Sequence, residues 1–210
     1  PSHNRLVVTV IGDPAALKDA VVASYGTAVE LIDMTKHEGQ HPRMGAVDVC
    51  PFIPCRNTTV AEADEIAKAV AKEVGEKYGI PCFLYEDSAS APHRVNLASI
   101  RKGQFEGMAE KMKDTEMWTP DFGPSKMHPT AGVTAIGARM PLVAFNVNLG
   151  TDNLEIANQI ARRIRHINGG YRFIKAIGIM LEDINLAQVS MNFTNYAKTS
   201  VYRPCEAVKM

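Results

Sequence analysis

The sequence predicts a mixed α/β protein (α/β or α+β) built of two layered units. In its first part, β-branched runs alternate with helical stripes in the order strand, helix, strand, helix, strand. The later part adds a ferredoxin-like order of strand, helix, strand and strand, without the last helix and strand of that motif. The length of 210 residues suits one larger domain or two small ones. We therefore divide the chain into residues 1–141 and 142–210.

A β-branched run opens the first unit. Residues 5–12 read RLVVTVIG, and such a run that ends at a glycine predicts a buried strand. Asp13 and Pro14 follow as a helix N-cap and a proline at the first helical position. Apolar residues then recur at helical spacing, which predicts a helix that ends near residue 34.

The second strand of this unit is predicted at residues 46–53, after a polar loop. Pro51 and Pro54 lack backbone donors, so we expect this strand to bulge or to lie partly at an edge of the sheet. Thr59 and Glu62 have the spacing of a capping box. They begin a helix whose apolar stripe ends at a glycine.

The periodicity fades after a short third strand at residues 81–85. Short helices are predicted at residues 97–102 and 104–113. Residues 119–138 are rich in proline and glycine and are predicted to form one long loop. Loops of this length are uncommon inside compact proteins and usually carry function, so this segment is a candidate binding loop.

The second unit has three strands around one capped helix. Asp152 and Glu155 predict the start of the helix, and Gly169 with Gly170 predicts its end. A further helix opens at about residue 199. The strands are predicted at residues 142–149, 173–181 and 186–193.

The composition argues against several classes of protein. Lys and Arg together number 23, as do Asp and Glu, so the net charge is zero and a strongly basic nucleic-acid binder is disfavoured. No apolar run approaches the roughly 18–20 residues that cross a bilayer. Four cysteines do not suggest a disulfide scaffold, and the first residues do not resemble a signal peptide. We expect a cytoplasmic protein that binds neither nucleic acid nor membranes.

The spacing of potential ligands disfavours metal and nucleotide sites. His37 and His41 are four residues apart in a loop with no Cys or carboxylate cluster of metal-ligand spacing, so we expect no metal. Cys50 and Cys55 lack the second pair of a zinc knuckle and are interpreted as apolar strand residues. The sequence also lacks the motifs of phosphate-binding loops, dinucleotide-binding turns and serine hydrolases.

The tripeptide His41-Pro42-Arg43 suits an acid or base that faces an anionic substrate. Proline fixes the backbone beside a side chain that titrates near neutral pH, and arginine supplies a fixed cation. A histidine solvated in a loop remains the alternative. Arginines near strand ends and in loops would form a carboxylate-binding groove if they converged, and Lys126 and His128 are candidates to join it. These arginines are Arg5, Arg43, Arg94, Arg101 and Arg139.

Five long and unusual strings carry a resemblance to a known family. They are HPRMGAVDVCPFIP at residues 41–54, DFGPS at 121–125, GVTAIGAR at 132–139, LVAFNVNL at 142–149 and LAQVS at 186–190. In this order they resemble glutamate formimidoyltransferase, the formiminotransferase domain of formiminotransferase-cyclodeaminase. The resemblance extends over nearly the whole chain.

The resemblance implies an enzyme of histidine degradation and one-carbon metabolism. It would transfer the formimino group from N-formimino-L-glutamate to N5 of tetrahydrofolate, giving 5-formiminotetrahydrofolate and glutamate. Tetrahydrofolate would be the co-substrate, and no metal is implied. The family fold has two subdomains whose sheets face each other across a ligand channel. A homodimer and a cyclodeaminase partner are expected from the family.

The resemblance also assigns roles to residues of this chain. The histidine of the HPRMG string is the catalytic acid or base, and it is His41 here. Arg43 and Arg139 are our candidates to hold substrate carboxylates. The folate-binding segment maps to Gly123, Pro124, Ser125, Lys126, Met127, His128, Pro129, Thr130, Ala131 and Gly132.

Two departures from the family leave an alternative function open. Family members have a strand and helix before the segment that begins this chain, and further elements after its end, so we expect both units to be incomplete. Catalysis by this chain alone therefore stays open. The alternatives are a folate-binding protein, or a related enzyme that processes 5-formyltetrahydrofolate without formiminoglutamate.

Overall fold

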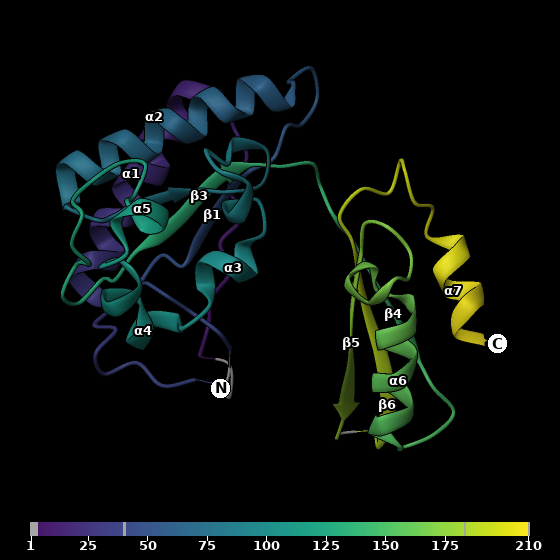
Figure 1. Cartoon of the computed structure of the whole chain (residues 1–210). Coiled ribbons are helices and arrows are strands. Elements are labelled where there is room, and N and C mark those ends of the chain that lie inside the picture. Colours follow the sequence, from purple (N-terminus) through teal and green to yellow (C-terminus); the bar gives the residue numbers. More distant parts are fainter. Residues whose placement is uncertain (1–3, 40, 183, 210) are drawn as a thin grey trace. The chain divides into compact units, whose positions relative to one another are not determined.

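The chain folds into two compact units that divide between Arg139 and Met140. The computed structural model describes residues 4–39, 41–182 and 184–209, and Figure 1 traces the chain. A parallel sheet in the first unit and an antiparallel sheet in the second confirm the predicted mixed fold class. Within the described residues, no helix has both the length and the apolar character needed to cross a membrane.

The first unit has three short parallel strands with helices on both faces. Its elements are α1 (Pro14–Leu31), β1 (Val49–Phe52), α2 (Val60–Tyr78), β2 (Cys82–Leu84), η1 (Glu86–Ser88), η2 (Pro92–Arg94), α3 (Leu97–Arg101), α4 (Gln104–Lys111), α5 (Thr115–Trp118) and β3 (Thr134–Ala138). The strand order is β1-β3-β2. Helices α1 and α2 pack on one face, and α3 and α4 pack on the other.

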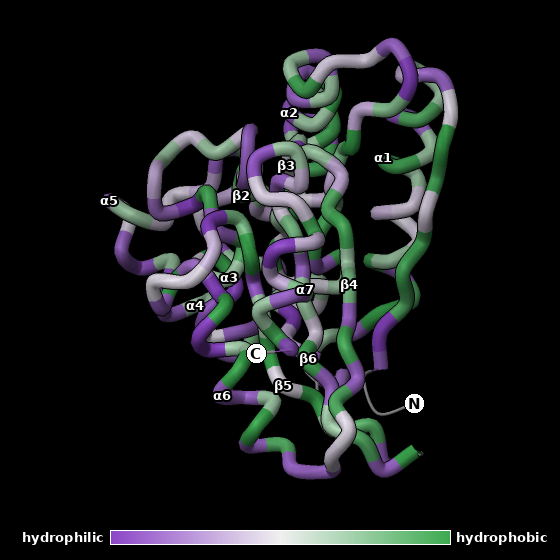
Figure 2. The backbone as a smooth tube through the Cα atoms, turned by 90° about the vertical axis from the view of Figure 1, so that its right-hand side faces the viewer, coloured by the Kyte–Doolittle hydropathy of each residue, from purple (hydrophilic) through white to green (hydrophobic). Residues whose placement is uncertain are grey.

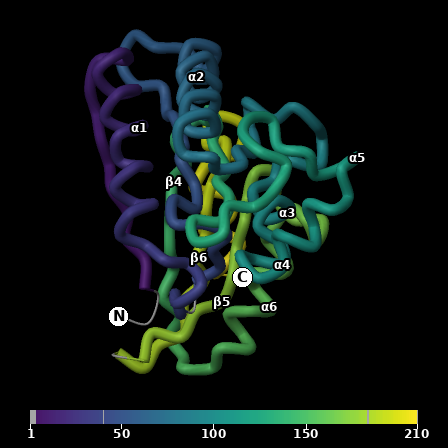
Figure 3. Tube along the Cα trace, turned by 90° about the vertical axis from the view of Figure 1, so that its left-hand side faces the viewer, coloured from purple at the N-terminus to yellow at the C-terminus, as the bar shows by residue number. Residues whose placement is uncertain are grey.

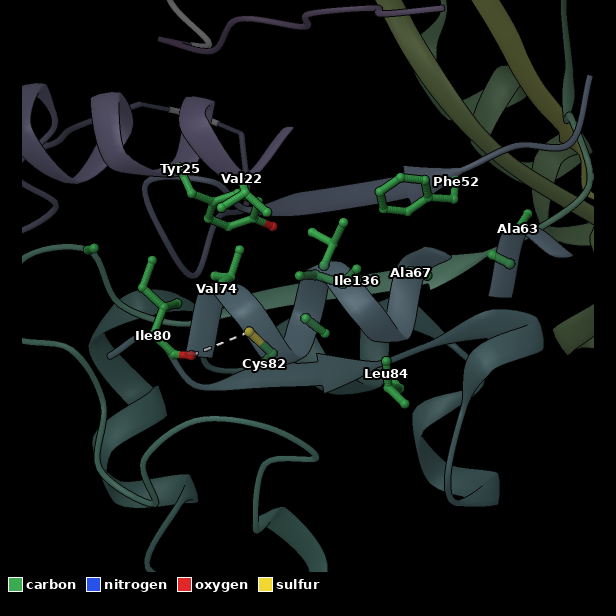
Figure 4. Packing of buried hydrophobic residues seen from close by; sticks show 14 residues of the cluster. Val22, Tyr25, Phe52, Ala63, Ala67, Val74, Ile80, Cys82, Leu84 and Ile136 are labelled. Carbon is green, nitrogen blue, oxygen red and sulfur yellow. Dashed lines mark hydrogen bonds between the residues drawn. The ribbon is translucent and has the colours of Figure 1, made fainter. Parts of the chain in front are cut away.

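The core between the sheet and α1 and α2 is apolar, with one buried polar pair. Figure 4 shows Val22 and Tyr25 of α1, Val74 of α2 and Ile136 of β3 gathered in this layer. The Tyr25 hydroxyl lies 2.9 Å from the Thr134 hydroxyl, and both side chains are buried. This hydrogen bond satisfies two polar groups that would otherwise destabilise the core.

The predicted helix caps of this unit are confirmed. The Asp13 carboxylate accepts a hydrogen bond from the Ala15 amide at 3.0 Å. Thr59 and Glu62 form the reciprocal capping box at the start of α2, and Gly79 ends that helix with φ +63°. The proposed edge position of the second strand is also confirmed, because β1 pairs only with β3 among the described strands.

The predicted strand at residues 5–12 is wrong. Residues 4–13 have no regular secondary structure, and their apolar side chains are exposed, from 51% for Val10 to 82% for Leu6. Figures 2 and 3 show this segment as an extended thread beside α1. A β-branched run forms a strand only where another strand offers backbone partners, and no described strand pairs with this segment.

The prediction of one long loop at residues 119–138 is wrong at its end. Residues 134–138 form β3, the buried central strand of the sheet. The small residues of this strand obscure it in the sequence, yet the packing requires them. A Cβ atom on Gly137 would lie 2.3 Å from the Tyr85 carbonyl oxygen, so the neighbouring chain leaves no space for a side chain.

The second unit combines an antiparallel sheet with two helices. Its elements are β4 (Val143–Asn148), α6 (Leu154–Ile164), η3 (His166–Asn168), β5 (Ile174–Leu181), β6 (Leu186–Phe193) and α7 (Tyr202–Lys209). The strand order β4-β6-β5, with α6 between β4 and β5 along the chain, is the split βαβ arrangement expected of a ferredoxin-like unit. Helices α6 and α7 contribute buried residues to one core with the sheet.

Two details of α6 differ from the prediction. Asn153, not Asp152, is the N-cap, because its side chain accepts the Glu155 amide at 3.0 Å. On this helix Ile156 is 42% exposed, whereas Ala157 and Ala161 are buried. A Cβ on Gly178 of β5 would lie 2.7 Å from the Asn158 amide nitrogen, so small residues on both elements allow this close approach. The helix also ends at Ile164, before the predicted glycine pair.

Gly137→Ala should destabilise the first unit. The added methyl group must displace the Tyr85 carbonyl, and overpacking of this kind costs about 1–3 kcal/mol of unfolding free energy. Urea denaturation followed by circular dichroism measures this loss. Gly12→Ala is the matched control, since a Cβ there meets no atom within 4 Å. Equal stability of the two variants would contradict the packing argument.

Candidate active site

His41 lies in the loop that connects α1 to β1, and its ring is surrounded by polar partners. The ring is partly buried. Its Nδ1 atom lies 2.7 Å from the Pro42 carbonyl oxygen. The Arg5 guanidinium comes from the start of the chain, with Nη1 2.7 Å from Nδ1 and 3.2 Å from Nε2. A guanidinium group has only donors, so at least one ring nitrogen must be an unprotonated acceptor.

Asp48 ties this histidine to two arginines. It stands immediately before β1 and its side chain is 12% exposed. One carboxylate oxygen accepts hydrogen bonds from Arg101 at 2.5 Å and from Arg5 at 3.3 Å. The other accepts the Met44 amide at 2.9 Å, which closes the loop on itself. One carboxylate therefore joins segments that are far apart in the sequence.

The environment favours the neutral form of His41. Burial lowers its pKa below the usual range, and the positive charges of Arg5 and Arg101 lower it further. The Pro42 carbonyl and the Asp48 carboxylate act in the opposite direction without reversing the shift. A neutral imidazole at neutral pH is able to accept a proton, which suits a general base.

The loop of His41 is joined to the predicted folate-binding segment through backbone contacts. The Met44 carbonyl accepts the Val133 amide at 3.1 Å, and Ala46 donates to the Ala131 carbonyl at 2.9 Å. Between these bonds, Gly45 and Gly132 face each other as an isolated bridge. The structure therefore brings together two segments that the sequence separates by more than 80 positions.

This contact requires a glycine at position 132. Its φ is +72°, and a Cβ there would lie 2.3 Å from the Met44 carbonyl oxygen. A Cβ on Gly45 would lie 2.1 Å from the Val133 carbonyl oxygen. Any side chain at either position separates the two loops. Gly123 has a similar role against α2 and the residues that follow it, because its own Cβ would lie 3.2 Å from the Gly75 Cα and 2.5 Å from the Ile80 carbonyl oxygen.

Part of the predicted folate-binding segment lines a surface hollow of about 730 Å³. This volume lies within the range of small-molecule sites, roughly 300–1,000 Å³. The hollow combines apolar side chains with two lysines and one histidine. Its lining residues are Gly79, Ala109, Met112, Lys113, Pro124, Ser125, Lys126, Met127, His128 and Pro129.

The other members of that segment support the loop. The Thr130 carbonyl accepts a hydrogen bond from the Met34 amide at 2.8 Å, and Ala131 is buried. The His128 ring accepts the Ala131 amide at 2.9 Å. A second hollow, of about 690 Å³, shares Met127 with the first and is lined by His37 and Arg43. His41 lines neither of these two hollows.

The comparisons with known proteins agree on one family. The profile of the formiminotransferase domain, N-terminal subdomain, matches residues 1–139, and that of the formiminotransferase domain matches residues 144–210. A glutamate formimidoyltransferase of Streptococcus pyogenes serotype M1 is 59% identical over 208 residues, covering 99% of this chain and 69% of the relative. The chain belongs to the formiminotransferase family.

Further relatives share the match over the whole chain. A glutamate formimidoyltransferase of Thermoplasma acidophilum is 46% identical over 212 residues, covering 100% of this chain and 69% of the relative. A formimidoyltransferase-cyclodeaminase of Dictyostelium discoideum is 45% identical over 208 residues, covering 96% of this chain and 38% of the relative.

The five predicted arginines do not form one groove in this formiminotransferase chain. Arg5 and Arg101 converge on His41 through Asp48. Arg139 follows the opposite end of β3, where its charge acts on the Tyr85 hydroxyl. The remaining two, Arg43 and Arg94, are each paired with a carboxylate.

Arg43 is 13% exposed and forms a two-pronged pair with Glu106. The two contacts measure 2.9 Å and 2.5 Å. The Arg43 guanidinium lowers the pKa of the Glu106 carboxyl to about 2.

Arg43 Nε also donates to His37 Nδ1 at 3.4 Å, while His37 Nε2 lies 2.8 Å from the Asn4 carbonyl oxygen. His37 and His41 therefore have separate partners, and the described residues contain no cluster of three or more His, Cys, Asp or Glu side chains suited to a metal.

Asp121 and Arg94 form a buried pair at the start of the binding segment. Their side chains are 11% and 7% exposed, and the N–O distance is 2.9 Å. The same Asp121 oxygen accepts the Leu84 amide at 2.7 Å, and Arg94 also donates to the Met117 and Thr119 carbonyls. This pair holds the chain ahead of residues 123–132 against β2.

Cysteine chemistry is disfavoured at the site. Burial raises the pKa of the Cys50 thiol to about 12, which opposes formation of the nucleophilic thiolate. Cys82 is also buried. The interpretation of Cys55 as a strand residue is wrong, because β1 ends at Phe52 and Cys55 lies exposed after it, beyond Pro54.

Sequence reasoning missed Asp48 and Asp121 as site-forming residues. Both lay inside the quoted family strings, but neither has a spacing signal of its own. Asp48 stands directly before the short strand β1, and Asp121 lies in an irregular segment. Their roles depend on arginines more than 25 residues away in the sequence.

Asp121→Asn should lower the free energy of unfolding by about 3–5 kcal/mol, because it leaves the buried Arg94 charge unpaired. Urea denaturation measures the loss. Glu155→Gln is the control, since its pair with Arg162 is 56% exposed on both sides and should contribute about 0–1 kcal/mol. A similarly small loss in both variants would show that Asp121 does not stabilise the Arg94 charge.

Glu106→Gln should weaken the dependence of stability on acid pH. The folded-state pKa of Glu106 is about 2, below the ordinary value of about 4.3, so the unfolded chain binds more protons between these values. The contribution of the Glu106–Arg43 pair to the free energy of unfolding is complete above about pH 4.3 and is lost as the pH falls toward 2.

Urea denaturation of the Glu106→Gln variant at several pH values tests this expectation. The variant should lose less unfolding free energy than the parent chain as the pH falls. Glu110→Gln, in an exposed pair with Lys113, should follow the parent chain. A Glu106 variant that follows the parent chain as well would show that the pair does not control acid stability.

Proposed function

We propose that this chain transfers the formimino group from N-formimino-L-glutamate to N5 of tetrahydrofolate, giving 5-formiminotetrahydrofolate and glutamate. The reaction belongs to histidine degradation and one-carbon metabolism. Its main support is a relative named glutamate formimidoyltransferase that is 59% identical over 99% of the chain. The structural observation that carries the proposal is His41, a histidine whose environment favours its neutral form, in a loop bonded to the segment that lines the larger hollow.

In this proposal His41 is both base and acid. N5 of tetrahydrofolate attacks the amidine carbon of the formimino group and loses a proton to the neutral imidazole. The resulting imidazolium lies beside the charges of Arg5 and Arg101, which make it a stronger acid. It then returns the proton to the departing glutamate nitrogen as the carbon–nitrogen bond breaks. General acid–base catalysis of this kind contributes roughly 10²–10⁴ in rate.

Residues 123–132 are the proposed tetrahydrofolate site. Pro124 to Pro129 would contact the folate in the hollow, where Met127 offers an apolar surface. Lys126 and Lys113, which both line the hollow, would attract its carboxylates. Gly123, Thr130, Ala131 and Gly132 would hold the loop in shape through their backbone contacts.

Arg43 and Arg139 remain our proposed carboxylate-binding residues. Arg43 has the fork geometry that suits a carboxylate. Its present partner, Glu106, is 63% exposed and would have to give way to the substrate. Arg139 has less support, because it follows the carboxyl end of β3 while His41 precedes the amino end of β1.

The assembly is proposed from the family. Residues 1–141 and 142–210 would form the two subdomains. A cyclodeaminase partner fits relatives that are named formimidoyltransferase-cyclodeaminase, such as that of Mus musculus, of which this chain covers 39%. A homodimer is proposed from the family resemblance alone. Tetrahydrofolate would act as co-substrate without a metal, and the cytoplasm is the expected compartment.

His41→Ala should lower the rate of formimino transfer by roughly 10²–10⁴, because the proton acceptor is lost. The folate dissociation constant should change little, since His41 lines neither hollow. Turnover is measured by the formation of 5-formiminotetrahydrofolate, and binding by tetrahydrofolate titration. His166→Ala, an exposed histidine of η3, is the control and should keep full activity.

A panel of substrates separates the proposed reaction from its alternatives. The intact protein is assayed with formiminoglutamate and with 5-formyltetrahydrofolate. Turnover of the second compound alone would identify a different folate enzyme. Tight folate binding without turnover, unaffected by the His41 substitution, would identify a binding protein.

A further inference from the structure

The start of the chain is attached to the candidate active site by polar contacts. Asn4 donates to the Glu38 carbonyl at 2.8 Å, and the Asn4 carbonyl lies 2.8 Å from the His37 ring. Arg5 continues this attachment and reaches His41 and Asp48. The residues that follow are exposed and apolar. The segment is thus held at residues 4 and 5, next to the histidine.

We infer that Arg5 is a positioning residue for His41 and that Asp48 holds Arg5 in place. The inference rests on the proposed function for the role of His41 in catalysis. Arg5 Nη1 is within hydrogen-bond distance of both ring nitrogens, so the arginine constrains the ring orientation. The same Nη1 atom lies 3.3 Å from the Asp48 carboxylate, so the guanidinium is held from the other side.

Two partners of opposite kind compete for Nδ1 of His41. The Pro42 carbonyl oxygen, 2.7 Å away, can only accept a hydrogen bond, whereas Arg5 Nη1, also 2.7 Å away, can only donate one. With the proton on Nδ1 the ring donates to Pro42 and offers Nε2 to Arg5 at 3.2 Å, and with the proton on Nε2 it accepts from Arg5 through Nδ1. In either neutral tautomer Arg5 therefore faces an acceptor nitrogen of the ring.

The charged groups that face His41 come from three elements. Arg5 belongs to the initial segment, Asp48 to the residue before β1, and Arg101 to α3. Two positive charges and one negative charge leave a local excess of one positive charge. This excess favours the neutral imidazole and also the release of a proton taken up during catalysis.

A merely structural role for Arg5 makes a different prediction. Asp48 already has Arg101 at 2.5 Å and the Met44 amide at 2.9 Å, so the loop is closed without Arg5. If Arg5 only attached the start of the chain, its removal would change stability and leave the titration of His41 as it was. If Arg5 positions the ring, its removal alters the pKa of His41.

The test uses Arg5→Met and Arg5→Lys in the intact protein. NMR titration of the histidine ring protons, with His41 assigned by its alanine variant, measures the pKa independently of activity. Arg5→Met should raise that pKa toward the ordinary value for histidine, because a nearby positive charge is lost. Arg5→Lys should keep it low, because the charge remains. Arg56→Met, an exposed arginine in a turn, is the control.

Steady-state kinetics of the same variants separate a role of Arg5 in positioning His41 from a role in substrate binding. Arg5→Met should lower kcat by up to roughly 100-fold with a smaller change in KM, since misplacement of a catalytic group affects the chemical step. Arg5→Lys should recover part of kcat. Asp48→Asn should lower kcat as well, and the double variant should lose less than the product of the two single losses, because each single variant already removes the contact between Arg5 and Asp48.

An unchanged His41 pKa in folded Arg5→Met would overturn the inference, as would additive losses in the double variant. If Arg5→Met does not fold, Arg5→Gln is titrated in its place with the same expected rise. Absence of formimino transfer in the parent protein would reject the proposed function instead. The NMR result would then still report whether Arg5 controls the ring.

Discussion

The contact between Gly45 and Gly132 is the constraint on which the candidate site depends. Two loops meet there backbone to backbone, and a Cβ atom on either glycine would lie within 2.3 Å of a carbonyl oxygen. One loop carries His41 and Asp48, and the other continues into the segment that lines the larger hollow. Without this contact, the histidine and the hollow would belong to unrelated parts of the surface.

The location of the site follows from that contact. In open α/β sheets, ligands usually bind beyond the carboxyl ends of the strands. Here the loop of His41 precedes β1 and the hollow-lining segment precedes β3, so both lie at the amino ends of two adjacent parallel strands. The carboxyl end of β3 instead leads through Arg139 into the second unit.

A neutral chain produces a locally positive site by unequal pairing. Two carboxylates of the first unit are each matched by one arginine, Asp121 by Arg94 and Glu106 by Arg43. Asp48 is shared by two arginines, and the unmatched charge acts on His41. This excess of charge would attract an anionic group, and the overall composition gives no sign of it.

Local chemistry was readable from the sequence, whereas pairing across the chain was not. Helix caps such as Thr59 with Glu62 involve neighbours within one turn, so the sequence alone determined them, as it did the family strings around His41. The initial β-branched run did not become a strand, because that outcome requires a partner strand. Arg5 and Arg101 lie 43 and 53 residues from Asp48, and only the tertiary structure decided that they share its carboxylate, since such contacts depend on how separate elements pack.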